Sequence, residues 1–191
     1  MANGVGRRHC MARIGRACAG ALMILTALAA SASAQDQAAP PPHVRGDDTM
    51  RRFIDEAARR SPAIREWIDR LQQMDVTVYV RMTVFSRRDL EGRVALLSTA
   101  GSHRYLVIEL ACLRTEIAQM ATLGHELFHA IEIAEEPSVV NAESLAAFYT
   151  RIGVKTGDGG GLRTFETGAA AAAELRARRQ LLTSTRNGNG T

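Results

Sequence analysis

The sequence predicts an α+β domain in which helices flank a small antiparallel sheet of three to four strands. Two observations lead to this class. Within residues 76–111, apolar and polar residues alternate in β-branched segments. On both sides of that stretch, apolar residues recur at helical spacing. The helices therefore precede and follow the strands instead of alternating with them, which is the order typical of α+β folds.

The first 34 residues are expected to be a secretory signal peptide. Four arginines precede an apolar run at 17–30, and the small-residue sequence SASA follows it, so cleavage is expected after Ala34. The run is short for a membrane span, and no second long apolar stretch follows. We therefore expect an exported protein, periplasmic or secreted, with no membrane anchor after cleavage.

The composition excludes two classes of partner. The chain has 24 Lys+Arg and 20 Asp+Glu, and the signal segment contains four arginines and no acidic residue, so 20 of each remain. This neutral balance gives no basis for binding nucleic acid or an anionic membrane.

Cys112 is the one cysteine beyond the signal segment, so no disulfide can form within that part. Its apolar surroundings predict a buried thiol.

The rest of the chain is expected to form one domain with flexible ends. Residues 35–47 are polar and rich in proline, so we expect a mobile linker in which His43 is exposed to solvent. A single domain is expected from 48 to 183, with a disordered tail at 184–191.

The domain is expected to begin with two helices and continue with three strands. Apolar positions recur at helical spacing from 48 to 73, and Ser61-Pro62 divides them, because serine caps helices and proline suits the first turn. The strand sequences are DVTVYVRM, GRVALLSTA and RYLVIELA, separated by polar turns. Their short connections favour an antiparallel meander, with a short fourth strand near Thr83–Ser86. Glu109 on the third strand is expected to face solvent and to have no catalytic role.

Helical spacing returns after the strands. A broad apolar face extends from residue 113 to 134, a shorter helix is expected at 142–152 with Asn141 as its cap, and a final helix at 165–182. The glycine-rich sequence GVKTGDGGGLRT between the last two helices is expected to be a flexible loop.

The first of these helices contains the pattern HExxH, as His125, Glu126 and His129. Residues i and i+4 lie on one face of a helix, so both imidazoles can reach a single zinc ion. Glu126 is turned by about 100° from His125 and can act as general base toward a water beside the metal. It is the one Asp, Glu, Lys or Arg between residues 118 and 131. A pair of surface histidines beside a helical glutamate is the alternative interpretation.

A catalytic zinc site also needs a third protein ligand. Glu132 lies one turn further along, but one straight helix is poorly arranged to place three ligands around an ion. Glu143 and Glu166, each at the start of a later helix, are the two alternatives. Glu166 is favoured, because the alanines after it allow close approach of two helices, whereas Glu143 requires an immediate reversal of the chain.

The HExxH segment resembles the metal-binding helix of the zincin metallopeptidases. That family prefers Val or Thr three residues before the first histidine, uncharged residues inside the motif and an apolar residue two after the second histidine. The matching positions here are Thr122, Leu123, Leu127, Phe128 and Ile131. The glycine and histidine with which metzincins continue the motif are replaced by Glu132 and Glu135. The resemblance is therefore to gluzincins, whose third ligand is a glutamate, and it implies a zincin-like fold.

The chain also resembles a group of exported bacterial proteins over most of the expected domain. These share the patterns ATLxHELxHAxEIA, YxRIG and FETxxA, which begin here at Ala121, Tyr149 and Phe165. The resemblance implies a zinc peptidase, and it favours Glu166 over Glu143 because only Glu166 belongs to a shared pattern. Tyr149 and His103 are weaker candidates for oxyanion donors, and a packed tyrosine and a turn histidine are the favoured interpretations.

We therefore expect an exported zinc-dependent metallopeptidase that hydrolyses peptide bonds in a peptide or protein substrate. Its Zn2+ would be held by His125, His129 and Glu166, with Glu126 as general base. The alternative function is that of a non-catalytic, zincin-fold binding protein of the cell envelope.

Overall fold

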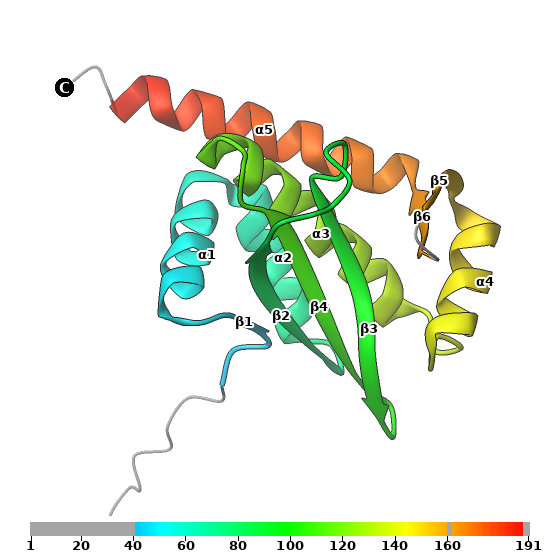
Figure 1. The fold of residues 1–191 in the computed structure, drawn as a ribbon. Helices are drawn as coiled ribbons and strands as arrows, with labels where there is room; N and C mark the ends of the chain where they lie inside the picture. The colour runs from blue at the N-terminus through cyan, green and yellow to red at the C-terminus, as the bar shows by residue number, and fades with distance from the viewer. Residues whose placement is uncertain (1–40, 160–161, 189–191) are drawn as a thin grey trace, which may run out of the picture. The chain divides into compact units, whose positions relative to one another are not determined.

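The computed structural model describes residues 41–159 and 162–188, and the expected signal peptide lies outside them. These residues form an α+β fold of five helices, a four-stranded mixed sheet and a two-stranded hairpin (Figure 1). The elements in chain order are β1 (Val44–Arg45), α1 (Asp48–Arg60), α2 (Pro62–Gln72), β2 (Val76–Thr83), β3 (Gly92–Ala100), β4 (His103–Ala111), α3 (Glu116–Glu135), α4 (Ala142–Ile152), β5 (Val154–Gly159), β6 (Leu162–Glu166) and α5 (Gly168–Gly188). No helix in this part of the chain combines the length and apolarity needed to span a membrane.

The sheet is mixed, so the antiparallel meander predicted from the sequence is wrong. Its strand order is β1-β2-β4-β3, with β2 parallel to β4 and β3 antiparallel to β4. The connection at residues 84–91 leads from β2 past the C-terminal end of β4 to β3. The tight turn after β3 then returns the chain as β4, which lies between β2 and β3. The almost completely buried β4 thereby gains a hydrogen-bonded partner on each side, while the less apolar β3 takes the edge.

The fourth strand is β1 and not the predicted segment near Thr83–Ser86. Val44 lies in the segment expected to be a flexible linker, and it pairs in parallel with Val78 of β2. His43 is half-buried, since its backbone N–H donates to Gln72 Oε1 at 2.8 Å and its Nδ1 lies 3.1 Å from the carbonyl oxygen of Leu71. The prediction of an exposed His43 is therefore wrong.

The core lies between the sheet and the helices. In Figure 1 the strands lie in front of α2 and α3, and α5 runs along the helical layer. The largest completely buried side chains come from the facing surfaces of these elements and include Ile64, Leu71, Leu106, Ile108, Leu110, Leu123, Leu127 and Ile131. Ser61 is the cap of α2, as predicted, and accepts a hydrogen bond from the N–H of Ile64 at 3.3 Å.

The C-terminal end of α3 is held by a buried arginine of the sheet. Arg104 on β4 donates from Nη1 to the carbonyl oxygen of Ala134 in the last turn of α3 at 3.5 Å, and from Nη2 and Nε to those of Glu136 and Val139 just after the helix at 3.0 and 2.8 Å. The last carbonyl groups of a helix have no partner within the helix, and a cation stabilises that end of the helix dipole. Arg104 therefore fixes the position of α3 relative to the sheet.

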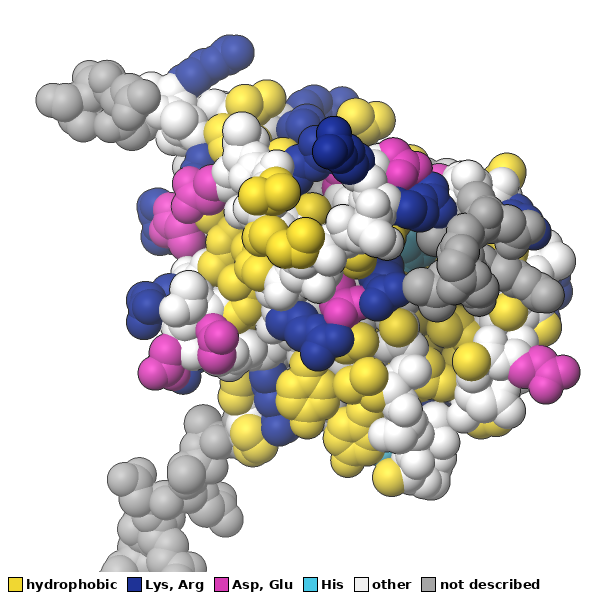
Figure 2. Space-filling view, in the orientation of Figure 1, with side chains coloured by type: hydrophobic (Ala, Val, Ile, Leu, Met, Phe, Trp, Pro, Cys, Tyr) yellow, Lys and Arg dark blue, Asp and Glu magenta, His cyan; other side chains and the backbone are white. Residues whose placement is uncertain are grey.

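Glu109 is buried, which corrects the prediction that it faces solvent. It lies on the sheet surface opposite the helices, between its register partners Arg81 on β2 and Arg93 on β3, and both arginines donate to it. Burial would raise the pKa of Glu109, but these hydrogen bonds outweigh it and hold the pKa below its ordinary value. Figure 2 shows hydrophobic, basic and acidic side chains gathered over the strands on this face.

Three further predictions are corrected at the ends of strands and helices. The expected glycine-rich loop forms the antiparallel hairpin of β5 and β6. Helix α5 extends to Gly188, into the tail expected to be disordered, while residues 189–191 lie outside the described residues. Cys112 is exposed and not buried, because it lies in the turn just after β4.

Candidate metal centre

Helix α3 presents the two histidines of the HExxH pattern side by side. The ring centroids of His125 and His129 are 4.8 Å apart, with an interplanar angle of 74°. His129 is buried, and the side chain of His125 is 12% exposed. Because they are four residues apart on a regular helix, both rings leave the same face of α3. The interpretation as an exposed pair of surface histidines is therefore wrong.

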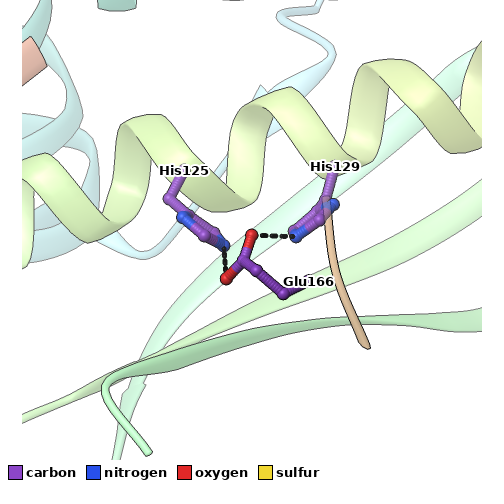
Figure 3. Close-up of side chains that lie close together, drawn as sticks. All are labelled: His125, His129 and Glu166. Carbon is purple, nitrogen blue, oxygen red and sulfur yellow. Dashed lines mark ion pairs between the residues drawn. The ribbon is translucent and has the colours of Figure 1, made fainter. Parts of the chain in front are cut away.

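Glu166 meets these histidines from a different element. Its Oε2 lies 3.4 Å from His125 Nε2, and its Oε1 lies 4.0 Å from His129 Nε2 (Figure 3). Ligand atoms of the three side chains all lie within 4.8 Å of one another, so these residues form a group that could hold a metal ion. Glu143 is exposed in the first turn of α4 and does not belong to the group.

A strand, and not a helix, positions Glu166. It is the last residue of β6 and pairs with Val154 of β5, whereas the sequence predicted that it lies in the first turn of a helix. Gly153 allows this arrangement, because a Cβ atom there would fall 2.9 Å from the carbonyl oxygen of Glu166. The C-terminal end of α4 can therefore lie directly against the backbone of the third candidate ligand.

Carboxylates lie behind both histidine rings. His129 Nδ1–H donates to Glu132 Oε2 at 2.7 Å, and His125 Nδ1 lies 3.4 Å from Glu174 Oε2. Among the described residues, His125 Nδ1 is buried without a hydrogen-bond partner in good geometry, so we treat its contact with Glu174 as electrostatic. A proton held on Nδ1 leaves the lone pair of Nε2 free for a metal ion. The donor set therefore fits a metal on the Nε2 side, where Glu166 lies.

The contact between His125 and Glu174 changes the pKa of both groups. Burial opposes protonation of His125, but the nearby carboxylates, Glu174 foremost, outweigh it and raise the pKa of the imidazole. The same contact, together with Arg178 Nη2 at 2.6 Å, lowers the pKa of Glu174 to about 2. Sequence reasoning missed Glu174, although it is the one carboxylate that ends the alanine run after Glu166.

Glu126 of α3 is buried, and its side chain lies beside β3, one of the two edge strands of the sheet. Its burial raises its pKa, and the two neighbouring histidines oppose that effect. Gly92 of β3 makes room for the carboxyl group, because a Cβ atom there would lie 2.8 Å from Glu126 Oε1. The side chain of Glu126, the acidic residue of the HExxH pattern, therefore lies between α3 and β3.

Tyr149 and His103 occupy structural positions. The buried Tyr149 hydroxyl lies 3.3 Å from His129 Nδ1 and donates to the backbone oxygen of His129 at 3.2 Å, on the side of the ring away from Glu166. Its burial raises the pKa of the phenol. The ring nitrogens of His103 lie 2.5 Å from Asp75 Oδ1 and 2.9 Å from Thr77 Oγ1, in a separate cluster.

Comparison of this chain with models of protein families, with curated proteins and with solved structures found no match. The chemistry of the site rests on two histidines of one helix, a glutamate of a separate strand and a buried glutamate next to the first histidine in the sequence.

Proposed function

We propose that the protein is an exported zinc-dependent metallopeptidase with a zincin-like, gluzincin-type site. The observation that carries the proposal is the convergence of His125, His129 and Glu166, which come from two elements far apart in the sequence. Two imidazoles and one carboxylate are a ligand set of catalytic zinc sites, which keep the fourth position open. The 38% exposure of the Glu166 side chain supports access from solvent on that side.

Zinc is the ion that these donors favour. Imidazole nitrogen suits zinc and other transition metals, whereas calcium and magnesium prefer ligand sets made of oxygen alone. A zinc ion in this position supplies a Lewis acid that polarises a carbonyl group and makes water acidic near neutral pH. The carboxylates behind the histidines support the proposal further, because they keep the Nε2 atoms available as ligands.

Glu126 is proposed as the general base. Its carboxylate takes a proton from the attacking water and delivers it to the amine that leaves when the peptide bond breaks. The reaction needs no covalent intermediate with the protein. Burial beside β3 shields the carboxylate from bulk water, and its raised pKa makes it a stronger base than an exposed glutamate.

A peptide is the substrate class that the surroundings of Glu126 favour. Strand β3 is an edge strand, and Gly92 at its start lies against the Glu126 side chain. An extended peptide can add to such an edge by backbone hydrogen bonds, which would bring its carbonyl groups close to the site.

The test combines metal content with hydrolysis of a mixed peptide library, for protein purified without a histidine tag. We expect one zinc per chain, retained in Glu126→Gln, and turnover lowered at least about 1,000-fold in that variant because the base is lost. Glu166→Ala should lose the zinc. Glu143→Ala, which changes an exposed glutamate outside the site, is the matched control and should keep both zinc and activity.

Two results would contradict the proposal. Full activity of Glu126→Gln would exclude Glu126 as the base, and loss of zinc in Glu143→Ala but not in Glu166→Ala would exclude the ligand set. Stoichiometric zinc with no hydrolysis of any peptide would instead favour the non-catalytic binding protein of the cell envelope.

A further inference from the structure

We infer that Glu132 and Thr167 act together as a positioning pair that orients His129 and ties it to Glu166. The inference rests on the proposed metal site and adds two residues to it. Neither residue belongs to the group of three candidate ligands. Glu132 lies on α3, and Thr167 stands between β6 and α5, so the pair joins the two parts of the chain that supply those ligands.

The contacts form an unbroken chain from one ligand to the other. His129 Nδ1–H donates to Glu132 Oε2 at 2.7 Å, and the Thr167 hydroxyl donates to Glu132 Oε1 at 2.8 Å. The backbone N–H of Thr167 then donates to Glu166 Oε1 at 2.9 Å. Both oxygens of Glu132 and both donors of Thr167 are thereby used. Displacing either residue removes a hydrogen bond from a candidate ligand or from its partner.

Glu132 cannot serve as a fourth ligand in this arrangement. It approaches His129 from the Nδ1 side, whereas Glu166 lies on the Nε2 side. Its side chain is only 12% exposed, and burying a carboxylate is costly unless hydrogen bonds compensate for lost solvation. Its two hydrogen bonds supply that compensation. The carboxylate therefore fixes the tautomer and the direction of the His129 ring.

The Thr167 hydroxyl has a single proton, so it can donate only one hydrogen bond. That proton goes to Glu132, while Thr167 Oγ1 accepts from the N–H of Ala170 at 3.1 Å in the first turn of α5. In Glu132→Gln an amide NH2 can replace the oxygen that Thr167 needs, and the negative charge beside the His129 ring disappears. The variant keeps the size of the side chain and changes its charge and its hydrogen bonding.

Glu174 provides an internal comparison. It lies behind His125 as Glu132 lies behind His129, but its other partner is Arg178 on its own helix and not Thr167. The inference therefore predicts that Thr167 is coupled to Glu132 and independent of Glu174.

The test measures zinc affinity by competition with a chromophoric chelator for Glu132→Gln, Thr167→Val and the double variant. Each single variant should bind zinc at least about tenfold more weakly, as is usual for groups that orient metal ligands. The double variant should be little weaker than either single variant, because one connection is lost in all three. Glu174→Gln combined with Thr167→Val should instead multiply the two losses. Thr167→Ser keeps the hydroxyl and should restore affinity.

Two controls separate positioning from general destabilisation. Thr115→Val makes the same substitution at the cap of α3, where Thr115 Oγ1 accepts from the N–H of Ala118 at 3.4 Å. It should lower the melting temperature without changing zinc affinity. In the metal-free protein, nitrogen-15 NMR should find the neutral His129 ring protonated on Nδ1, and Glu132→Gln should shift it toward the Nε2 tautomer.

The outcomes distinguish this inference from the proposed peptidase function. Zinc affinity unchanged in Thr167→Val, or losses that multiply in Glu132→Gln/Thr167→Val, would overturn the positioning pair and leave the peptidase proposal standing. The predicted losses of affinity in a protein that hydrolyses no peptide would support the pair and refute the peptidase.

Discussion

Replacing Gly92 by alanine is expected to displace the proposed general base without removing the metal. The added Cβ atom would lie 2.8 Å from Glu126 Oε1 and 2.5 Å from Thr122 Cγ2. The Glu126 carboxyl must therefore retreat by about 0.6 Å to reach the 3.4 Å at which ordinary contact begins. Because the Glu126 side chain is buried, this movement must displace neighbouring atoms or change the rotamer.

Two effects of different size should follow. Overpacking costs about 1–3 kcal/mol, so the melting temperature should fall by about 3–10 °C. A catalytic group misplaced by about 1 Å can lose on the order of 100-fold in rate, so kcat should fall by about 10- to 100-fold. Zinc content should stay at the wild-type value, since Glu126 is not one of the candidate ligands.

A second substitution separates these effects. Thr122→Ser removes the methyl group that the new Cβ meets first, so Gly92→Ala/Thr122→Ser should recover part of the lost stability. It leaves the contact with Glu126 Oε1 unchanged and should not recover the rate. Thermal unfolding, zinc content and peptide hydrolysis are measured on the same samples. Wild-type kcat in Gly92→Ala would show that the Glu126 carboxyl does not act from its place beside β3.

Two further predictions concern stability. Removal of zinc with a chelator should lower the melting temperature, because a ligand at 1,000 times its Kd stabilises the folded state by about 4 kcal/mol. The chelator should not change the melting temperature of Glu166→Ala. An equal change in that variant would place the metal elsewhere. Glu109→Gln should destabilise the fold by about 2 kcal/mol at pH 7. Because the folded-state pKa of Glu109 is lowered, its contribution is complete above the unfolded pKa of about 4.3 and is lost as pH falls through the folded value. Urea unfolding should therefore show the two proteins converging below about pH 4, and a difference independent of pH would refute this assignment.

The sequence was sufficient where local interactions determine the structure. The boundary between α1 and α2 follows from the capping of Ile64 N–H by Ser61, and α4 begins after Asn141 because that residue forms a capping box with Ser144. The spacing of His125 and His129 likewise depends on one helix alone. The structure brings both histidines together with Glu166, as the sequence predicted.

Sequence reasoning failed where distant segments decide the outcome. Nothing local in β2 or β3 shows that β4 will lie between them, because the connection at 84–91 is long enough to reach either side. Alternation along β4 places Glu109 on the face away from the helices, but its burial depends on Arg81 and Arg93 from the two neighbouring strands. The predicted meander does not place Arg81 of β2 beside Glu109, so it offers no sign of this burial.

The placement of Glu166 depends more on pairing within the β5–β6 hairpin than on helix α5. Its partner in the hairpin is Val154, and the residue before Val154 is Gly153, the C-cap of α4. Two short segments about a dozen residues apart therefore meet at the backbone of one candidate ligand. A side chain at Gly153 would press on the Glu166 carbonyl group while leaving α3 and its histidines untouched. The hydrogen bond between Thr167 and Glu132 is therefore one of the contacts that join the two halves of the metal centre, beside the contact of His125 with Glu174.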